Sequence, residues 1–457
     1  MKKNVIRLDE PFVSPGVFWV PQSTETFPAT LSYTPESGVE LQGVTGRIDR
    51  FSFRAREIPL LVGILADATP CSLSRVEMIS DSQACQAGIV PVSTSTFHVE
   101  LAVIGEAASL EGPSTFHEMH LGYTALRNIC PVPHISSEHV GDDVTLRFPA
   151  YREPILSVDV GTVMIRFLLH RILSIGAAAH GSYESELCVV SSNPRHFDDY
   201  EPYIGHLTGL VTLLAGQHSA PHLIRLVKHP NSETNRPTSA HVLFHYMHDF
   251  PDRKIRQQSV VTLRKLGDKA TNVVRNWLRS SEAARRVFNL YLGTLYVDAY
   301  VESHFLSLAQ AAESLHRVFH DDQPIPDDLF ERLKATLRSA LCDVPIPTEV
   351  AEAISHGFNF LNQLSFQNRL EQLVEMLAPE SRVKLVGDPA AFVRTIKQTR
   401  NYLTHPGTER KGSVLTEPID YALFNLRLGA FLRLLILRLL GAEETAVLEP
   451  VSSGVVF

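Results

Sequence analysis

The chain is poor in cysteine, and its cysteines follow no binding or pairing pattern. Cys71, Cys85, Cys130, Cys188 and Cys342 are odd in number, scattered, and form no Cys-x-x-Cys pair. This usage is typical of proteins in a reducing compartment and argues against both a disulfide framework and a structural zinc site. The sequence therefore predicts a cytoplasmic protein without disulfide bonds, and we expect no cofactor and no metal.

Long hydrophobic runs are also missing. The N-terminus carries Lys2 and Lys3 followed by mixed polar residues, without the apolar core of a signal peptide. The most apolar segment, residues 421–440, is interrupted by Arg427, Arg433 and Arg438 and is not a membrane span. We therefore expect no membrane partner and interpret this segment as a helix that is buried on most sides.

An overall excess of positive charge is absent as well. The net charge of −8 argues against a general nucleic-acid coat protein. Residues 394–411 differ, since five basic side chains oppose only Glu409, which gives 5 − 1 = +4. The five are Arg394, Lys397, Arg400, Arg410 and Lys411. Such a patch suits contacts with a short stretch of RNA backbone, although a solvated helix face explains the charge equally well.

Two periodicities divide the chain. Residues 12 to about 160 show short alternating apolar segments between turn-rich breaks, with a hairpin over 29–42, which predicts a β-sandwich or a barrel-like sheet. From residue 283 onward, long amphipathic helices with short connections predict an up-and-down bundle. We therefore predict an α+β chain, with a β-rich region over residues 1–280 and an all-α bundle over 281–457. A further boundary near residue 159 stays open.

One predicted helix near the C-terminus ends in a combination of reactive side chains. Asp388-Pro389 is a typical N-cap with proline in the first turn, and Pro406-Gly407 ends the helix. Arg400 and Asn401 then lie in its last turns. His405 lies at its C-terminus, where the helix dipole favours the imidazolium form and makes a histidine easy to poise near neutral pH.

Arg400 and His405 suit phosphoryl transfer on RNA. The histidine is a candidate base for a 2′-hydroxyl or acid for a 5′-oxygen, and the guanidinium can stabilise the charged phosphorane without a metal. Five residues turn a helix by about 500°, which leaves the two side chains about 140° apart. One helix alone can therefore hardly bring both side chains to the same phosphate, whereas two copies of the chain can. Taken alone, the pair is also explained by a surface arginine and a helix-capping histidine.

The region around this motif resembles a known family. Residues 283–442 resemble a HEPN domain of the branch found in ApeA-like bacterial anti-phage proteins, through residues 301–317, 362–370 and 399–405. In that family an Arg-x4-6-His motif with a polar residue after the arginine is the metal-independent ribonuclease site. The resemblance therefore assigns catalysis to Arg400, Asn401 and His405.

The first part of the chain resembles the N-terminal domain that accompanies ApeA-type HEPN modules. The similarity lies in the Gly-Val-Phe-Trp-Val-Pro segment at residues 16–21, the hairpin that follows it, and the Val-Ile-Gly segment at 103–105. The resemblance implies a domain that senses a trigger or restrains the nuclease. A phage-encoded trigger is the partner expected for it.

The leading hypothesis is a homo-oligomeric HEPN endoribonuclease, dimer or tetramer, that acts in anti-phage defence by abortive infection. It would cleave cellular RNA, with tRNA as one candidate. The alternative is a catalytically silent HEPN module that serves as a dimerisation or RNA-binding scaffold. In another branch of HEPN proteins, a partner nucleotidyltransferase adds adenylate to a tyrosine in the pattern Arg-x4-His-x-Tyr. This chain has Gly407 at the tyrosine position, so that form of regulation is not expected.

Several histidines and glutamates of the chain are not part of the predicted site. His117 and His120 lie three apart on a predicted strand and should face opposite sides. With no carboxylate or cysteine cluster to join them, these two and the pair His134 and His139 are expected to be structural or surface histidines. Glu302 and Glu313 fall on one face of a helix and could contact Arg400, but as exposed or capping carboxylates they need no special role.

The last long helix, over 418–440, carries more apolar surface than one bundle face covers. Part of it is expected to pack against a second copy of the chain, with Leu434 in that interface. A central position inside the chain's own bundle is the alternative.

Overall fold

The computed structural model describes residues 5–21, 23–44, 57–84, 92–108, 113–130, 136–140, 143–147, 155–175, 179–230, 237–246, 250, 256–320, 323–359, 361–405, 407 and 412–453. The chain divides into two compact units, Met1–Arg279 and Ser280–Phe457. The first, the β-rich unit, holds all the described strands, and the second, the helical unit, holds α5 to α13. The predicted α+β class is confirmed.

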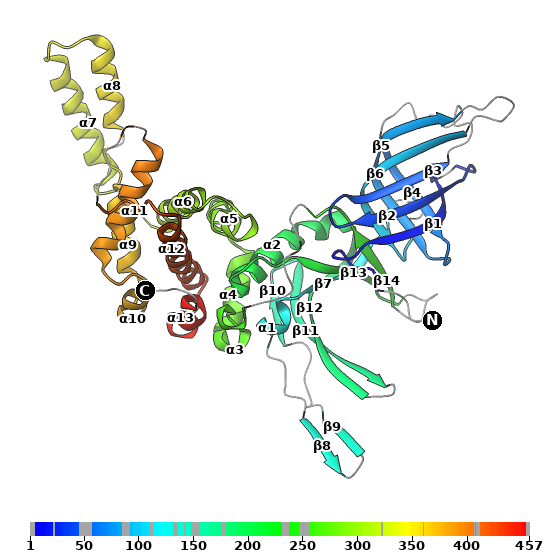
Figure 1. Ribbon diagram of the computed structural model, residues 1–457. Helices are drawn as coiled ribbons and strands as arrows, with labels where there is room; N and C mark the ends of the chain where they lie inside the picture. The colour runs from blue at the N-terminus through cyan, green and yellow to red at the C-terminus, as the bar shows by residue number, and fades with distance from the viewer. Residues whose placement is uncertain are drawn as a thin grey trace. The chain divides into compact units, whose positions relative to one another are not determined.

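Six strands of the β-rich unit, blue in Figure 1, form a closed antiparallel ring. They run in the order β6-β3-β2-β1-β4-β5, and β5 pairs back along most of β6. Their bounds are β1 (Phe12–Trp19), β2 (Phe27–Thr34), β3 (Gly38–Val44), β4 (Glu57–Leu65), β5 (Pro70–Ala84) and β6 (Val92–Ile104). Of the two predicted arrangements, the barrel-like sheet is therefore the one found.

Side chains that point inward from alternate positions along the strands fill the interior of the ring. The predicted hairpin is β2 paired with β3, and β2 buries every second residue from Phe27 onward. Phe18 of β1 is fully buried, with its ring 6.2 Å from that of Phe27. A Cβ on Gly63 of β4 would lie 2.4 Å from the Phe18 ring, so this strand needs glycine where the ring inserts.

Six further strands continue from the ring as an open sheet in the order β10-β11-β12-β7-β13-β14, with β14 paired to β6. Their bounds are β7 (Phe116–Tyr123), β10 (Leu156–Asp159), β11 (Val163–Ile175), β12 (Ala179–Arg195), β13 (Pro221–Lys228) and β14 (Thr238–Leu243). The helix α2 (Phe197–Ala215) packs on β7 and β12 and buries most of its second half. The Tyr123 and Thr208 hydroxyls are hydrogen-bonded at 3.0 Å between sheet and helix.

Short elements complete the β-rich unit. They are α1 (Leu126–Ile129), the separate hairpin β8 (Ser136–Val140) with β9 (Asp143–Arg147), the 3₁₀ turns η2 (Gln257–Ser259) and η3 (Gly267–Lys269), α3 (Leu263–Leu266) and α4 (Ala270–Leu278). The amphipathic α4 packs on β10 and α2, and the Trp277 indole N–H donates to the His206 carbonyl at 2.8 Å.

The helical unit follows the predicted order of helices. Its elements are α5 (Glu282–Tyr296), α6 (Val301–Phe319), α7 (Asp327–Cys342), α8 (Thr348–Phe358), α9 (Phe366–Glu375), α10 (Pro379–Leu385), α11 (Pro389–Thr404), α12 (Pro418–Leu439) and α13 (Glu444–Ser452). Aromatic side chains join three of them, since Phe392 of α11 lies 5.4 Å from Phe424 and 5.5 Å from Phe431 of α12, and Phe305 of α6 lies 6.1 Å from Phe424.

The position of α12 corrects one expectation. Residues 430–437 are buried throughout, and α12 packs against α5, α6, α10 and α13 of the same unit. Leu434 is 0% exposed, so it belongs to the core of the unit and not to a surface for a second copy. Exposed apolar residues occur instead in the first half of α12, at Ile419, Leu423 and Leu426.

The pair α7 and α8 extends away from the other helices of this unit (Figure 1). The two helices contact each other, and several of their apolar side chains, including Leu333 and Ile354, are exposed. None of the helices in the described part of the chain has the length and apolar character needed to cross a membrane.

Candidate active site

The motif helix α11 begins and ends as the sequence predicts. The Asp388 carboxylate accepts hydrogen bonds from the N–H groups of Ala390 and Ala391 at 2.9 and 3.2 Å, and Pro389 occupies the first turn. His405 is the C-cap, with extended backbone angles of φ −123° and ψ 96°, and its N–H donates to the Asn401 carbonyl at 3.0 Å. Its side chain is exposed, where RNA can reach it.

Arg400 faces α6 and α9 of its own unit. Its guanidinium carbon lies 5.3 Å from the centre of the Phe366 ring, and Nη2 lies 3.7 Å from Glu313 Oε2. The side chain remains 32% exposed. The ring of Phe366 and the carboxylate of Glu313 therefore orient the guanidinium while part of its surface stays open to solvent.

Glu313 is the centre of a group of arginines. Its Oε1 accepts from Arg369 Nη1 at 3.0 Å and from Arg317 Nη2 at 3.1 Å, while Oε2 faces Arg400. Three guanidinium groups thus lie around one carboxylate where α6, α9 and α11 meet.

Sequence reasoning named Arg400 as a possible partner of Glu313, and the structure confirms that the two side chains are in contact. The carboxylate was nevertheless kept out of the predicted site as exposed or capping, but its side chain is only 12% exposed. Its contact with Arg369 was not predicted. Arg369 is 56 residues away along the chain, so only the packing of α9 against α6 brings the pair together.

The remaining predicted contacts lie along the same helix. Lys397 donates to Gln367 Oε1 of α9 at 3.0 Å, Arg394 is exposed, and Asn401 is half-buried. Arg410 and Lys411, the other two predicted RNA contacts, lie outside the described residues.

Leu415, ten residues after His405, lies against α11. The fully buried Thr399 hydroxyl accepts a hydrogen bond from the Leu415 N–H at 3.1 Å. Thr399 directly precedes Arg400, so this bond joins Leu415 to the turn that carries the motif.

Two family models cover most of the chain. The model described as ApeA N-terminal domain 1 matches residues 14–277, which is more than half of the protein. The chain belongs to the ApeA family. The model described as Apea-like HEPN matches residues 306–446, which include α11 with Arg400, Asn401 and His405.

The resemblance inferred from the sequence is thereby confirmed for both parts of this ApeA-type chain. It is a HEPN-domain protein of a class linked to anti-phage defence, and HEPN domains are generally associated with ribonuclease activity and RNA binding. Searches of the curated proteins and of the solved structures gave no match.

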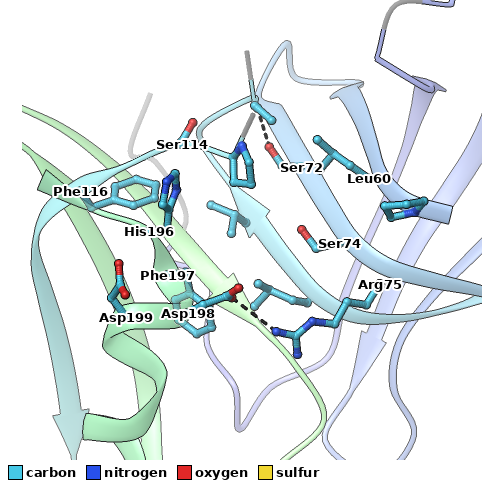
Figure 2. Close-up of a pocket in the computed structure, with 15 residues that line it drawn as sticks. Leu60, Ser72, Ser74, Arg75, Ser114, Phe116, His196, Phe197, Asp198 and Asp199 are labelled. Atoms are coloured by element: carbon cyan, nitrogen blue, oxygen red, sulfur yellow. Dashed lines mark hydrogen bonds and ion pairs between the residues drawn. The ribbon is translucent and has the colours of Figure 1, made fainter. Parts of the chain in front are cut away.

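The β-rich unit of this ApeA protein contains a cavity of about 520 Å³ (Figure 2), a size typical of small-molecule sites. Strands β4 to β6 and the first turn of α2 line it, with Phe116, His196 and Asp198 on one side and Arg75 on the other. Arg75 Nη2 lies 3.5 Å from Asp198 Oδ1. Its backbone has φ +53°, a left-handed conformation that is rare for arginine.

The histidines of β7 depart from expectation in one respect. Glu118 and His120 share a face of β7, and Glu186 and Cys188 of β12 lie within reach of the His120 ring. The premise that no carboxylate or cysteine joins these histidines is therefore wrong, because strand pairing brings together residues 68 positions apart. His134 and the side chain of His139 lie outside the described part of the chain.

Proposed function

We propose that this ApeA protein is a metal-independent endoribonuclease whose catalytic residues are Arg400, Asn401 and His405. The observation that carries the proposal is the end of α11 within the Apea-like HEPN match. There an arginine oriented by Glu313 and Phe366 shares a helix end with a solvent-exposed histidine.

Each residue has a role in the cleavage step. His405 takes the proton of the RNA 2′-hydroxyl, whose oxygen attacks the adjacent phosphorus, while the bond from phosphorus to the 5′-oxygen breaks. The departing 5′-oxygen accepts a proton from an imidazolium, which is His405 of the second copy. The products are a 2′,3′-cyclic phosphate and a 5′-hydroxyl. Arg400 stabilises the negative charge of the phosphorane, and the Asn401 amide donates to its oxygens.

This mechanism needs two copies, and the helical unit offers a surface for the second. Ile419, Leu423 and Leu426 follow one another at helical spacing on α12 and are 63%, 37% and 48% exposed. Tyr402, inside the motif, is also 39% exposed. In each copy α11 packs against α12, so contact between the exposed apolar faces of two α12 helices brings two motif helices together. This arrangement supports a homodimer as the catalytic form.

The β-rich unit is the regulatory part of the proposal. The cavity beside Arg75 provides a binding site for a small molecule or a side chain of a phage-encoded trigger. A nuclease that acts by abortive infection must stay silent until infection, so a large non-catalytic unit fits that role. Cellular RNA, with tRNA as the first candidate, is the proposed substrate.

The end groups of the RNA products test the reaction. Cleavage by 2′-hydroxyl attack should leave ends that resist a ligase requiring a 3′-hydroxyl and become ligatable after cyclic-phosphate removal. A substrate with a single 2′-deoxynucleotide at the mapped cleavage position should stay intact at that position. Cleavage of this deoxy substrate at the same bond would contradict the mechanism.

The second candidate function is a catalytically silent scaffold that binds RNA or forms dimers. One observation favours it, because Arg400 already contacts Glu313 and the Phe366 ring and has a structural explanation without RNA. A scaffold would bind RNA equally well with His405 changed to alanine and would leave the RNA uncut. The nuclease instead requires the histidine for every turnover.

A further inference from the structure

Four side chains meet at one place in the open sheet of the β-rich unit. In the register of β7 and β12, Cys188 lies directly opposite His120, and Val190 opposite Glu118. Residues two apart on a strand share a face, so Glu118 and His120 lie on one side of β7 together with Cys188. Glu186, two residues before Cys188, lies on the same face.

The distances among three of these groups are those of a metal site. His120 Nε2 lies 2.8 Å from Glu118 Oε2 and 3.4 Å from Cys188 Sγ, and Cys188 Sγ lies 3.8 Å from Glu118 Oε2. A tetrahedral zinc ion bound to nitrogen, oxygen and sulfur separates its ligand atoms by roughly 3.3–3.6 Å. The three atoms therefore need to shift by only about half an ångström.

The other side of His120 has the support that a metal-binding histidine needs. Its Nδ1 lies 2.9 Å from Glu186 Oε2, and that same oxygen accepts from Arg225 Nη2 at 2.9 Å. Histidines that bind metals usually donate their second N–H to a carboxylate, which fixes the ring orientation. Arg225 lies opposite His120 on β13, so three adjacent strands build this arrangement.

The burial of the group also calls for a cation. His120 and Cys188 are buried and Glu118 is 19% exposed, with the carboxylates of Glu118 and Glu186 on the two ring nitrogens of His120. Buried charges in proteins are paired or coordinate metal ions, so this setting suits a cation.

We propose that Glu118 Oε2, His120 Nε2 and Cys188 Sγ bind a Zn²⁺ ion that links β7 to β12 in the β-rich unit. Thiolate, imidazole and carboxylate together favour zinc over magnesium or calcium. Binding requires the Cys188 thiolate, so the thiol proton leaves to solvent. The fourth position opens at the partly exposed edge of Glu118, where His229 Nε2 lies 3.0 Å from Glu118 Oε1. This site is separate from Arg400 and His405 and serves to stabilise the β-rich unit.

Cobalt substitution of the full-length protein tests the site directly. The wild-type protein, stripped with a chelator and refilled with Co²⁺, should develop a thiolate-to-cobalt charge-transfer band with one equivalent and lose it on addition of Zn²⁺. Cys188→Ser should lack the band. Cys71→Ser is the matched control, because it removes a buried thiol of the same unit and should keep it. Glu186→Gln should weaken the zinc affinity about 10–100-fold.

A wild-type protein that binds neither Co²⁺ nor Zn²⁺ in this titration would overturn the proposal, and so would a Cys188→Ser protein with an unchanged band. If Cys188→Ser fails to fold, His120→Gln takes its place, and the wild-type spectrum decides whether a thiolate binds the metal. The wild-type melting temperature should also rise with added Zn²⁺, and that of His120→Gln should stay unchanged.

Discussion

Arg317 and Arg369 can be compared to measure how much the contacts of Glu313 stabilise the candidate active site. Both donate to the same atom, Glu313 Oε1, at 3.1 and 3.0 Å. They differ in burial, because the Arg317 side chain is 44% exposed and that of Arg369 only 3%. Changing each to methionine keeps most of the aliphatic stem and removes the guanidinium. We therefore expect the more buried arginine, Arg369, to contribute more to the stability of the helical unit.

The magnitudes follow from the two environments. A hydrogen bond to a charged group in a buried site contributes about 1.5–3 kcal/mol. An exposed pair of residues four apart on a helix contributes about 0.3–0.5 kcal/mol. The free energies of unfolding should therefore differ by about 1–2.7 kcal/mol, or about five- to hundredfold in the unfolding equilibrium.

Differential scanning calorimetry of the full-length protein measures this difference. In a unit of this size about 1 kcal/mol shifts the melting temperature by about 2–4 °C. The transition of the helical unit should fall by about 3–12 °C in Arg369→Met and by about 1–2 °C in Arg317→Met. Equal shifts, or a larger shift for Arg317→Met, would refute the assignment of Glu313 and Arg369 as the buried pair of this site.

Two further predictions concern the same unit. Leu426→Glu should lower the oligomeric mass measured by light scattering without lowering the melting temperature. Leu434→Glu should instead destabilise the core by about 4 kcal/mol or more. An unchanged mass in a folded Leu426→Glu protein would contradict the proposed dimer surface. Thr399→Val removes the acceptor of the Leu415 N–H and should cost about 1 kcal/mol, while RNA cleavage should fall more steeply because the turn that carries Arg400 loses its attachment to Leu415. Cleavage at the wild-type rate by a folded Thr399→Val protein would show that this attachment has no catalytic role.

Local signals in the sequence were sufficient for much of the fold. Asp388-Pro389 and Pro406-Gly407 define the motif helix within a few residues, and the alternation over 29–42 predicts β2 and β3. These features depend on neighbours along the chain, so sequence reasoning reaches them. The β13 strand was missed, because its sequence starts with proline and mixes basic residues with apolar ones.

Long-range packing could not be predicted in the same way. The contacts of Glu313 with Arg369, and of His120 with Cys188, join residues more than 50 positions apart. The apolar sequence of α12 was equally compatible with a central helix and with an interface. Because Leu434 is fully buried, the second half of α12 is a central helix of its own unit.

The most direct test of the central claim is RNA cleavage in excess EDTA by the purified protein, alone and with lysate of phage-infected cells that lack the gene. His405→Ala is the test variant, and His356→Ala, on α8 of the same unit, is the matched control. The account predicts discrete fragments from the wild type and His356→Ala, and a cleavage rate about 10²–10⁴-fold lower for His405→Ala. Cleavage by His405→Ala at the wild-type rate, or intact RNA in both the triggered and untriggered wild-type reactions, would contradict it.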